Sequence, residues 1–239
     1  MTRPRASAGP LAAALGARGA RVVFAPLIRT LPPRSWRGLD AALKRLERFD
    51  AVAFASAQAV ESVFARAKTL KLRLKKPRVV AAVGKATAGA LSARGWKPSV
   101  VPEDARAAGL ARALKLPRGA RVLLPRAERG LEILPKSLAA SGAVVARAAA
   151  YRTVADASGR RALKRALASG ADAAFFASGS AAAGAKSLRR AFRDCAVVAI
   201  GPTTAAALTA AGLRPAAVAK TPEVGAQLAA IEAAVRRRR

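Results

Sequence analysis

Short apolar runs recur along the chain, and each is followed by a longer stretch of alanine, leucine and charged residues. The runs lie at residues 49–56, 79–83, 171–178 and 197–201. Serine, threonine or glycine closes or follows each run, and glycine ends the stretch behind it, as at helices that begin and end there. Strands that alternate with helices of about a dozen residues are typical of a parallel sheet covered on both faces. The pattern predicts an α/β protein with doubly wound parallel sheets.

This pattern occurs twice. The matching segments are residues 2–30 with 124–153, residues 49–56 with 171–178, and residues 79–87 with 197–204. The three offsets are nearly the same, and in both copies a helical stretch ends at glycine before an apolar run. An internal repeat of this length predicts two similar domains.

Two further segments, residues 26–33 and 149–154, lack helical periodicity and are bounded by proline or glycine. We expect them to be extended and to carry the chain between two domains, paired as a small antiparallel ladder. The pattern alone leaves open which βαβ unit belongs to which domain.

Composition limits the available chemistry. The chain has 239 residues, 53% of them apolar, which is enough for one large core or two modest ones. It has no histidine, which excludes Ser-His and Cys-His nucleophile pairs and the usual zinc ligand sets. Chemistry must therefore use hydroxyls, carboxylates, Lys, Arg or backbone groups. The one cysteine, Cys195, adjoins an apolar run and is expected to be buried and inert.

The net charge is +31, from 44 Lys and Arg against 13 Asp and Glu. Such a field attracts polyanions, including nucleic acid, acidic membrane surfaces and polycarboxylates. Surfaces that bind nucleic acid usually add aromatic platforms, whereas Trp36, Trp96 and Tyr151 are scattered along this chain. We interpret the charge, including its runs at residues 66–78 and 236–239, mainly as solvated helix faces. A basic module that binds nucleic acid or other polyanions is the alternative.

No apolar stretch reaches the roughly 18–20 residues that a membrane helix needs. The alanine-rich residues 11–16 are too short for a signal core before Arg18 and Arg21 interrupt them. We expect a soluble, cytoplasmic, monomeric protein. A nucleotide-binding Rossmann domain is disfavoured, because no G-x-G-x-x-G follows a strand and Gly84-Lys85 lacks the upstream glycine of a P-loop.

Seven short motifs resemble the uroporphyrinogen-III synthase family. They are Thr2-Arg3-Pro4; Pro26-Leu-Ile-Arg-Thr; Phe54-Ala-Ser56-Ala-Gln-Ala-Val-Glu61; Ala82-Val-Gly84-Lys-Ala-Thr87-Ala; Leu123-Leu-Pro-Arg-Ala-Glu128; Tyr151-Arg-Thr153; and Ala199-Ile-Gly-Pro-Thr-Thr-Ala205. Each motif is weak alone, but all seven occur in the family's order and cover nearly the whole chain.

The resemblance implies two flavodoxin-like domains joined by a two-stranded linker, with the substrate cleft between them. The first domain is discontinuous, residues 1–27 plus 152–239, and the second is inserted, residues 34–147. Residues 28–33 and 148–151 are then the linker strands. The implied reaction cyclises hydroxymethylbilane to uroporphyrinogen III with loss of water and inversion of the terminal pyrrole through a spiro intermediate. It requires no metal and no organic cofactor, and the only partner is a small polycarboxylate.

Hydroxyl and glycine positions after the apolar runs are the candidate substrate contacts. They are Ser56, Gly84, Thr87, Ser178, Ser180, Gly201, Thr203 and Thr204. The carboxyl ends of parallel strands are where doubly wound sheets bind ligands, and helix N-termini there favour carboxylates. A role limited to helix capping is the alternative for each. Thr203 and Thr204 are favoured as facing substrate, because the family pattern also points to them.

Tyr151 is the only tyrosine and lies in the second linker segment. In the family the matching tyrosine is the leading candidate for assisting loss of the hydroxyl group from the bilane. A phenol is protonated at neutral pH and can donate a hydrogen bond to the departing oxygen. A packing role is the alternative.

Arg3 and Arg126 occupy corresponding places in the two repeats and are candidates for contact with carboxylates. Gln58 and Lys85 also lie in the motif positions. Two departures from the family stand out. Ala55 and Ala177 replace a frequent threonine, and Met1 stands directly before Thr2-Arg3-Pro4, where the family has several apolar residues. We therefore expect the first strand to be clipped or to begin upstream of Met1.

Overall fold

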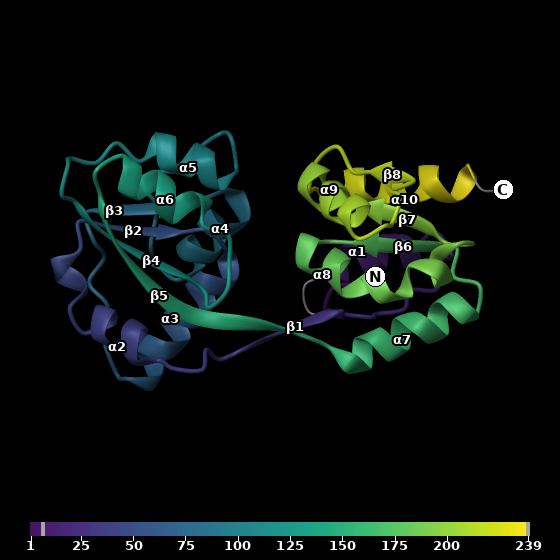
Figure 1. Cartoon of the computed structure of the whole chain (residues 1–239), viewed down its shortest axis with the longest axis horizontal. Helices are drawn as coiled ribbons and strands as arrows, with labels where there is room; N and C mark the ends of the chain where they lie inside the picture. Colours follow the sequence, from purple (N-terminus) through teal and green to yellow (C-terminus); the bar gives the residue numbers. More distant parts are fainter. Residues whose placement is uncertain (6–7, 238–239) are drawn as a thin grey trace. The chain divides into compact units, whose positions relative to one another are not determined.

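The computed structural model describes residues 1–5 and 8–237 (Figure 1). Of the basic run at residues 236–239, Arg238 and Arg239 lie outside this part. The chain divides into two compact units. The first unit consists of Met1–Arg29 and Val154–Arg239, and the second unit is Thr30–Thr153. The predicted linker segments fall on strands β1 (Ile28–Leu31) and β5 (Val144–Ala155), which are neighbours in one sheet.

The first unit has a parallel sheet in the order β6-β7-β8. Its elements are α1 (Gly9–Gly16), α7 (Ala157–Ala168), β6 (Ala173–Phe176), α8 (Gly179–Ala185), the 3-10 helix η3 (Lys186–Phe192), β7 (Ala196–Ala199), α9 (Pro202–Ala210), β8 (Ala217–Val218) and α10 (Val224–Arg236). One face of the sheet packs against Leu163 of α7 and Leu208 of α9. The other face packs against Leu11 of α1 and Ile231 of α10. Helices therefore cover both faces, as predicted.

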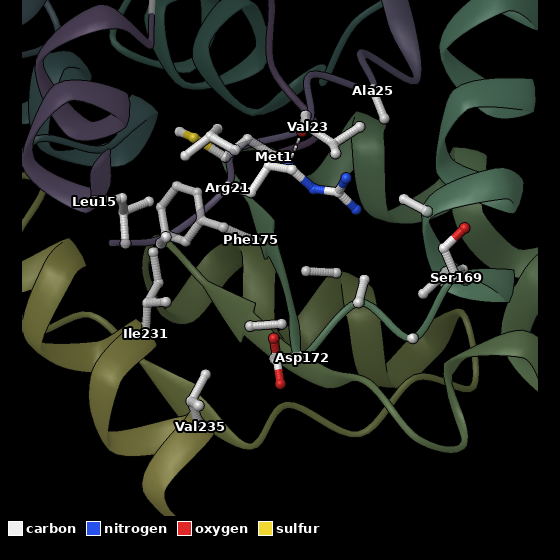
Figure 2. A pocket seen from close by; sticks show the side chains of 18 of the residues that line it. Met1, Leu15, Arg21, Val23, Ala25, Ser169, Asp172, Phe175, Ile231 and Val235 are labelled. Atoms are coloured by element: carbon white, nitrogen blue, oxygen red, sulfur yellow. Dashed lines mark hydrogen bonds between the residues drawn. The ribbon is translucent and has the colours of Figure 1, made fainter. Parts of the chain in front are cut away.

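The apolar run at residues 22–25 forms no regular strand, although its counterpart in the repeat does. Its backbone bonds to Met1, and a groove opens between this run and the start of β6 (Figure 2). Within residues 1–5 and 8–237, the backbone hydrogen bonds of this run to a neighbouring segment are those of Val23 and Ala25 to Met1.

The second unit has a five-stranded sheet in the order β1-β5-β4-β2-β3, and β5, β4, β2 and β3 are parallel. Its remaining elements are α2 (Arg37–Leu43), the 3-10 helix η2 (Leu46–Arg48), β2 (Ala51–Phe54), α3 (Ala57–Thr69), β3 (Val79–Ala82), α4 (Lys85–Ala93), α5 (Ala107–Ala113), β4 (Arg121–Ala127) and α6 (Ile133–Ala140). The parallel strands connected by helices confirm the predicted α/β class.

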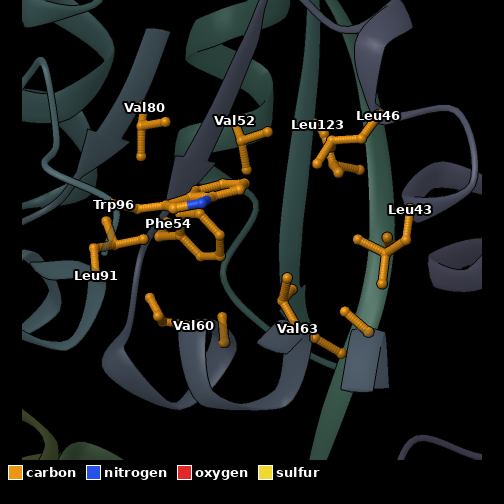
Figure 3. Close-up of a cluster of buried hydrophobic side chains, with 14 of the residues drawn as sticks. Leu43, Leu46, Val52, Phe54, Val60, Val63, Val80, Leu91, Trp96 and Leu123 are labelled. Carbon is orange, nitrogen blue, oxygen red and sulfur yellow. The ribbon is translucent and has the colours of Figure 1, made fainter. Parts of the chain in front are cut away.

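Alternate residues of β2 face the two layers of this unit. Val52 and Phe54 pack on one face with residues of α2, α3 and α4, where Trp96 also lies (Figure 3). Ala51 and Ala53 pack on the other face with residues of α5 and α6. All four are buried, which explains why the strand reads as a continuous apolar run.

Candidate active site

Serine caps one helix in each unit. The Ser56 Oγ accepts a hydrogen bond from the Ala59 N–H at 3.2 Å at the start of α3, and the Ser178 Oγ accepts one from the Ala181 N–H at 3.2 Å at the start of α8. Both serines are half-buried and lie directly beyond a parallel strand. Each oxygen therefore satisfies one N–H of the first helical turn and keeps its own hydrogen for another partner.

Glycine begins the next helix in each unit. Gly84 and Gly201 are the N-cap residues of α4 and α9, and neither helix has a side-chain cap. A Cβ at position 84 would lie 3.0 Å from the Ala105 Cβ, whereas position 201 is open. The first-turn N–H groups of these two helices thus face no capping side chain, which leaves them able to bind an anion.

The three candidate threonines differ in exposure. Thr87 and Thr204 are each 4% exposed and occupy the third position of α4 and α9, whereas Thr203 is exposed. The hydroxyls of Thr87 and Thr204 therefore lie against protein. Thr203 is the one whose side chain faces solvent at this helix end.

Tyr151 reaches the α3 face of its sheet through an irregularity in β5. The β4–β5 pairing steps from Arg126↔Ala149 to Ala127↔Tyr151, so Ala150 is an extra residue. Ala148 and Ala150 belong to the core on the α3 side, and Tyr151 packs against the same core. Regular alternation would have sent Tyr151 to the opposite face. The bulge re-aims its side chain, as bulges commonly do.

The Tyr151 hydroxyl lies 3.2 Å from the Ser56 Oγ, within hydrogen-bonding distance. Because the Ser56 oxygen already accepts from Ala59, the serine hydrogen is available to the tyrosine oxygen. The structure thereby brings together two predicted residues that are far apart in sequence. Sequence reasoning did not pair them, because nothing in the run of alanines before Tyr151 marks the bulge.

The two candidate arginines are in different environments. Arg126 is largely buried and already engaged: its Nη1 donates to Glu132 Oε1 at 2.8 Å and its Nη2 to the Leu131 carbonyl at 3.1 Å. This hydrogen bond is the main reason that the pKa of the Glu132 carboxyl lies below its usual value. Arg3 is partly buried and has no hydrogen bond or ion pair within residues 1–5 and 8–237. Burial lowers the pKa of its guanidinium. Arg3 is thus the better placed of the two to bind an external carboxylate.

The remaining candidates lie at the surface. Lys85 and Ser180 are exposed, and the Gln58 Nε2 donates to the Ser62 Oγ at 3.3 Å on the same helix. Cys195 is 4% exposed, as its apolar neighbours predict. Over the described residues, no group of three or more His, Cys, Asp or Glu side chains could hold a metal ion. The same part of the chain contains no helix that could span a membrane.

These features define an α/β protein with two parallel-sheet units that carries hydroxyls and open helix N-termini at its strand ends. Residues 9–229 match the family model for uroporphyrinogen-III synthase HemD. The chain therefore belongs to the uroporphyrinogen-III synthase family.

Individual relatives agree with this membership. The chain is 37% identical over 155 residues to the uroporphyrinogen-III synthase of Synechococcus elongatus, a match covering 64% of this chain and 59% of that protein. It is 32% identical over 155 residues to a putative uroporphyrinogen-III synthase of Methanothermobacter thermautotrophicus, covering 64% of this chain and 61% of that protein. The matched part thus spans less than two thirds of each relative.

Solved structures show the same fold. A mutant uroporphyrinogen III synthase from Thermus thermophilus aligns with a TM-score of 0.73 at 24% identity, covering 99% of this chain and 97% of that one. The enzyme from Helicobacter pylori aligns with a TM-score of 0.57 at 21% identity, covering 88% and 93%. Nothing in these comparisons favours the nucleic-acid alternative.

Proposed function

We propose that the protein cyclises hydroxymethylbilane to uroporphyrinogen III. The family membership and the hydrogen-bonded pair of Ser56 and Tyr151 support this proposal, and the pair is the observation that carries the chemistry. It places a phenol, held by a second hydroxyl, near the carboxyl end of β2, where sheets of this class bind ligands.

The first step breaks the bond between the hydroxymethyl carbon and its oxygen. The lone pair of the adjacent pyrrole nitrogen expels the hydroxyl group, which leaves as water once the pyrrole N–H proton is also lost, and an azafulvene remains. With the Ser56 hydroxyl as the donor in this pair, the phenol hydrogen stays available for the departing oxygen. This hydrogen bond favours the charge that develops on the leaving group.

The second step sets the isomer. The substituted α-carbon of the terminal ring attacks the azafulvene carbon and forms a spiro intermediate. The bond between the spiro carbon and its original bridging methylene then breaks, and that methylene bonds to the free α-carbon of the same ring. This α-carbon loses its proton and the deprotonated pyrrole nitrogen regains one, which leaves the ring inverted. The protein's part is to hold the terminal ring in the geometry for this attack, since the free α-position would otherwise react first.

We propose that carboxylates of the bilane bind to positively polarised groups that need no proton transfer. The open N–H groups at the starts of α4 and α9, the exposed hydroxyl of Thr203 and the cation of Arg3 are suited to this role. Ser178, Ser180, Gln58 and Lys85 are secondary contacts, whereas the buried Thr87 and Thr204 hold the first turns of α4 and α9 in place. We also propose a monomeric, cytoplasmic enzyme, which size-exclusion chromatography with light scattering and cell fractionation would test.

The test is the isomer that the purified protein makes from freshly generated hydroxymethylbilane. Chromatography of the oxidised products should show the type III isomer. If only the type I isomer forms, at the rate of the buffer control, the proposed function is wrong.

Substitutions at the pair test the role of the two hydroxyls. We expect Tyr151→Phe to lower kcat about 10–100-fold, at the lower end of acid catalysis. Ser56→Ala should lower kcat several-fold with little change in KM, and Ser56→Thr should restore it. Because Ser56 also caps α3, Asp156→Ala is the matched control: it removes the cap of α7 and leaves the pair intact. Equal losses of kcat in Ser56→Ala and Asp156→Ala would show that Ser56 acts only through stability.

A further inference from the structure

Strands β2 and β4 are neighbours in the sheet of the second unit, but the helices that follow them lie on opposite faces, as Figure 1 shows. Helix α3 packs with Val52 and Phe54 on one face, and α6 packs with Ala51 and Ala53 on the other. The chain therefore leaves two adjacent strands in opposite directions. In doubly wound sheets, ligands bind outside the carboxyl ends of the strands at such a point.

Two segments flank this point. Ser56, at the start of α3, flanks it on one side and belongs to the pair described above. Residues 128–132, the β4–α6 loop, flank it on the other. The Glu128 N–H of this loop donates to the Tyr151 carbonyl at 2.7 Å. The β4–α6 loop therefore lies at the edge of the sheet that carries the hydroxyl pair.

Apolar side chains at this loop face solvent. Leu131 is 76% exposed, and Ile133, the first residue of α6, is 50% exposed. No other large apolar side chain in residues 1–5 and 8–237 is as exposed as Leu131. Covering such a side chain with an apolar surface is favourable, because it removes both from water.

A buried guanidinium holds the backbone beneath Leu131. The Arg126 side chain is only 13% exposed; its Nη2 donates to the Leu131 carbonyl at 3.1 Å and its Nη1 to the Glu132 Oε1 at 2.8 Å. Gly130 leaves room for this group, because a Cβ there would lie 2.9 Å from the Arg126 Nη2. Arg147 donates to the other Glu132 oxygen at 2.7 Å. The backbone that carries Leu131 is thus fixed in advance, which lowers the entropic cost of binding.

The proposed substrate has surfaces that the groups considered so far do not bind. Its carboxylates suit helix N-termini, hydroxyls and a cation, whereas the faces of its pyrrole rings are apolar. We propose that Leu131 and Ile133 contact the pyrrole rings of the tetrapyrrole. Arg126 is a positioning residue: it holds Leu131 through the backbone and does not itself bind a carboxylate. This inference rests on the proposed function and assigns apolar contacts to the same site.

The first test shortens the exposed leucine. Leu131→Ala should raise KM for hydroxymethylbilane about tenfold and leave kcat within about twofold, because the contact is made equally with substrate and transition state. Leu131→Met should restore KM, since methionine keeps an apolar side chain of similar size. Val144→Ala is the matched control: Val144 is 58% exposed but begins β5 at the opposite edge of the sheet. Its KM should equal that of the unaltered protein, and Tm should be the same in all of these proteins.

Uroporphyrin III gives a binding measurement that needs no turnover. It is a stable, fluorescent tetrapyrrole with carboxylate side chains, so a fluorescence titration yields its Kd. We expect Leu131→Ala to raise this Kd about tenfold and Val144→Ala to leave it unchanged. The rise should be equal at about 0.1 M and about 1 M NaCl, because salt screens charges and not apolar contacts.

Arg126→Lys tests the positioning role. Lysine keeps the charge but lacks the planar fork that binds the Leu131 carbonyl and Glu132 together. We expect this substitution to raise the Kd for uroporphyrin III several-fold in the otherwise unaltered protein and by less than about twofold in Leu131→Ala, because the two residues act through one contact. An equal rise in both backgrounds would show that Arg126 binds the ligand directly, and its positioning role would be wrong.

Unchanged KM and Kd in Leu131→Ala would overturn the inference, and so would a failure of the unaltered protein to bind uroporphyrin III. Failure of the unaltered protein to form the type III isomer would instead overturn the proposed function. The comparison of Kd values would then still decide whether Leu131 contacts a tetrapyrrole.

Discussion

The α-amine of Met1 lies where the fold favours a neutral group. It is mostly buried and donates to the Val23 carbonyl, and the pKa of the amine falls from 8.0 to about 6 because burial penalises the charged form. The effect of Cys195 on this pKa is opposite and smaller. The amine therefore couples the stability of the first unit to pH.

We expect the free energy of unfolding to rise as pH increases from about 6 to 8. Below pH 8 the unfolded chain binds a proton at this amine, whereas the folded chain binds it only below about 6, so acid favours unfolding in this window. The chain has no histidine to titrate in the same range. The change is on the order of 2–3 kcal/mol.

Urea denaturation at pH 6, 7 and 8 measures this dependence. Protein acetylated at its α-amine is the control, because it has no proton to bind there and should show a flat profile. A slope that survives acetylation would assign the dependence to another group.

At the residue scale, the sequence predicted the helix-capping positions correctly, because capping depends on the residue type at the start of the helix. Ser56 and Ser178 follow apolar runs, and both were expected at helix starts, where they are found. The burial of Thr204 was not foreseen, although a signal existed: Thr204 and Leu208 are four residues apart, as are Thr87 and Leu91, and all four are buried. An apolar residue one turn later indicates the face of a helix that packs inward.

At the scale of elements, the start of α7 lies close to the backbone of Pro26 and Leu27. This close approach is possible because Gly159 has no side chain. A Cβ at Gly159 would lie 1.8 Å from the Pro26 carbonyl oxygen. The Asp156 N–H also donates to the Leu27 carbonyl at 2.9 Å, so the start of α7 is bound to this backbone. The Pro26 and Leu27 carbonyls are backbone groups that cannot turn aside. A side chain at position 159 would therefore force α7 to move.

We expect Gly159→Ala to destabilise the protein by about 3 kcal/mol, at the upper end for overpacking. Gly89→Ala is the matched control, because Gly89 lies within α4 with nothing within 4 Å of an added Cβ. This control should stabilise the protein by up to about 1 kcal/mol. Thermal denaturation followed by circular dichroism measures both. A Gly159→Ala protein as stable as Gly89→Ala would show that α7 can shift without cost.

The bulge in β5 marks the limit of sequence reasoning for elements. The strand itself was foreseen from the repeat, but the extra residue falls among Ala148, Ala149 and Ala150. Because these three side chains are identical, their hydropathy does not indicate which of them lie on which face of the sheet. The direction of Tyr151 therefore required the structure.

For the molecule as a whole, the high net positive charge follows directly from composition, and the ion pairs of the structure offset little of it. The chain has 44 basic and 13 acidic residues. Several of the acidic ones are paired, as Asp40 is with Arg66 at 2.7 Å and Glu132 with both Arg126 and Arg147. Because basic residues outnumber acidic ones more than threefold, the ion pairs offset only part of the repulsion between basic side chains, and this repulsion destabilises a compact state.

We expect Tm to rise by several degrees between 0.1 M and 1 M NaCl, as the Debye length falls from about 10 Å to about 3 Å. Over the same range KM for the proposed substrate, hydroxymethylbilane, should rise, because salt screens the attraction between its carboxylates and the basic protein as well as the repulsion within the protein. Repeating the series with sucrose at equal osmolality controls for solvent exclusion. A Tm that falls with salt would show that attractive ion pairs outweigh the repulsion.

The fold of each unit was largely predictable at this scale, because both halves of the chain contain the same apolar runs. These runs indicate the internal repeat and the alternation of strands and helices. Strand β4 was less evident, since Arg121 and Pro125 interrupt its apolar residues. The groove beside Met1 was not foreseen, because it depends on the hydrogen bonds that Met1 and Thr2 make with Val23, Ala25 and Phe175.

The glycine-capped starts of α4 and α9 determine which groups remain in place when the amino-acid sequence changes. A substitution replaces a side chain but leaves the main-chain N–H in its place, with proline the sole exception. Groups of this kind neither titrate nor vary between residue types. The surface around these helix starts can therefore be rich in alanine and arginine, as it is in this chain, and the same fixed dipoles still face an acidic molecule.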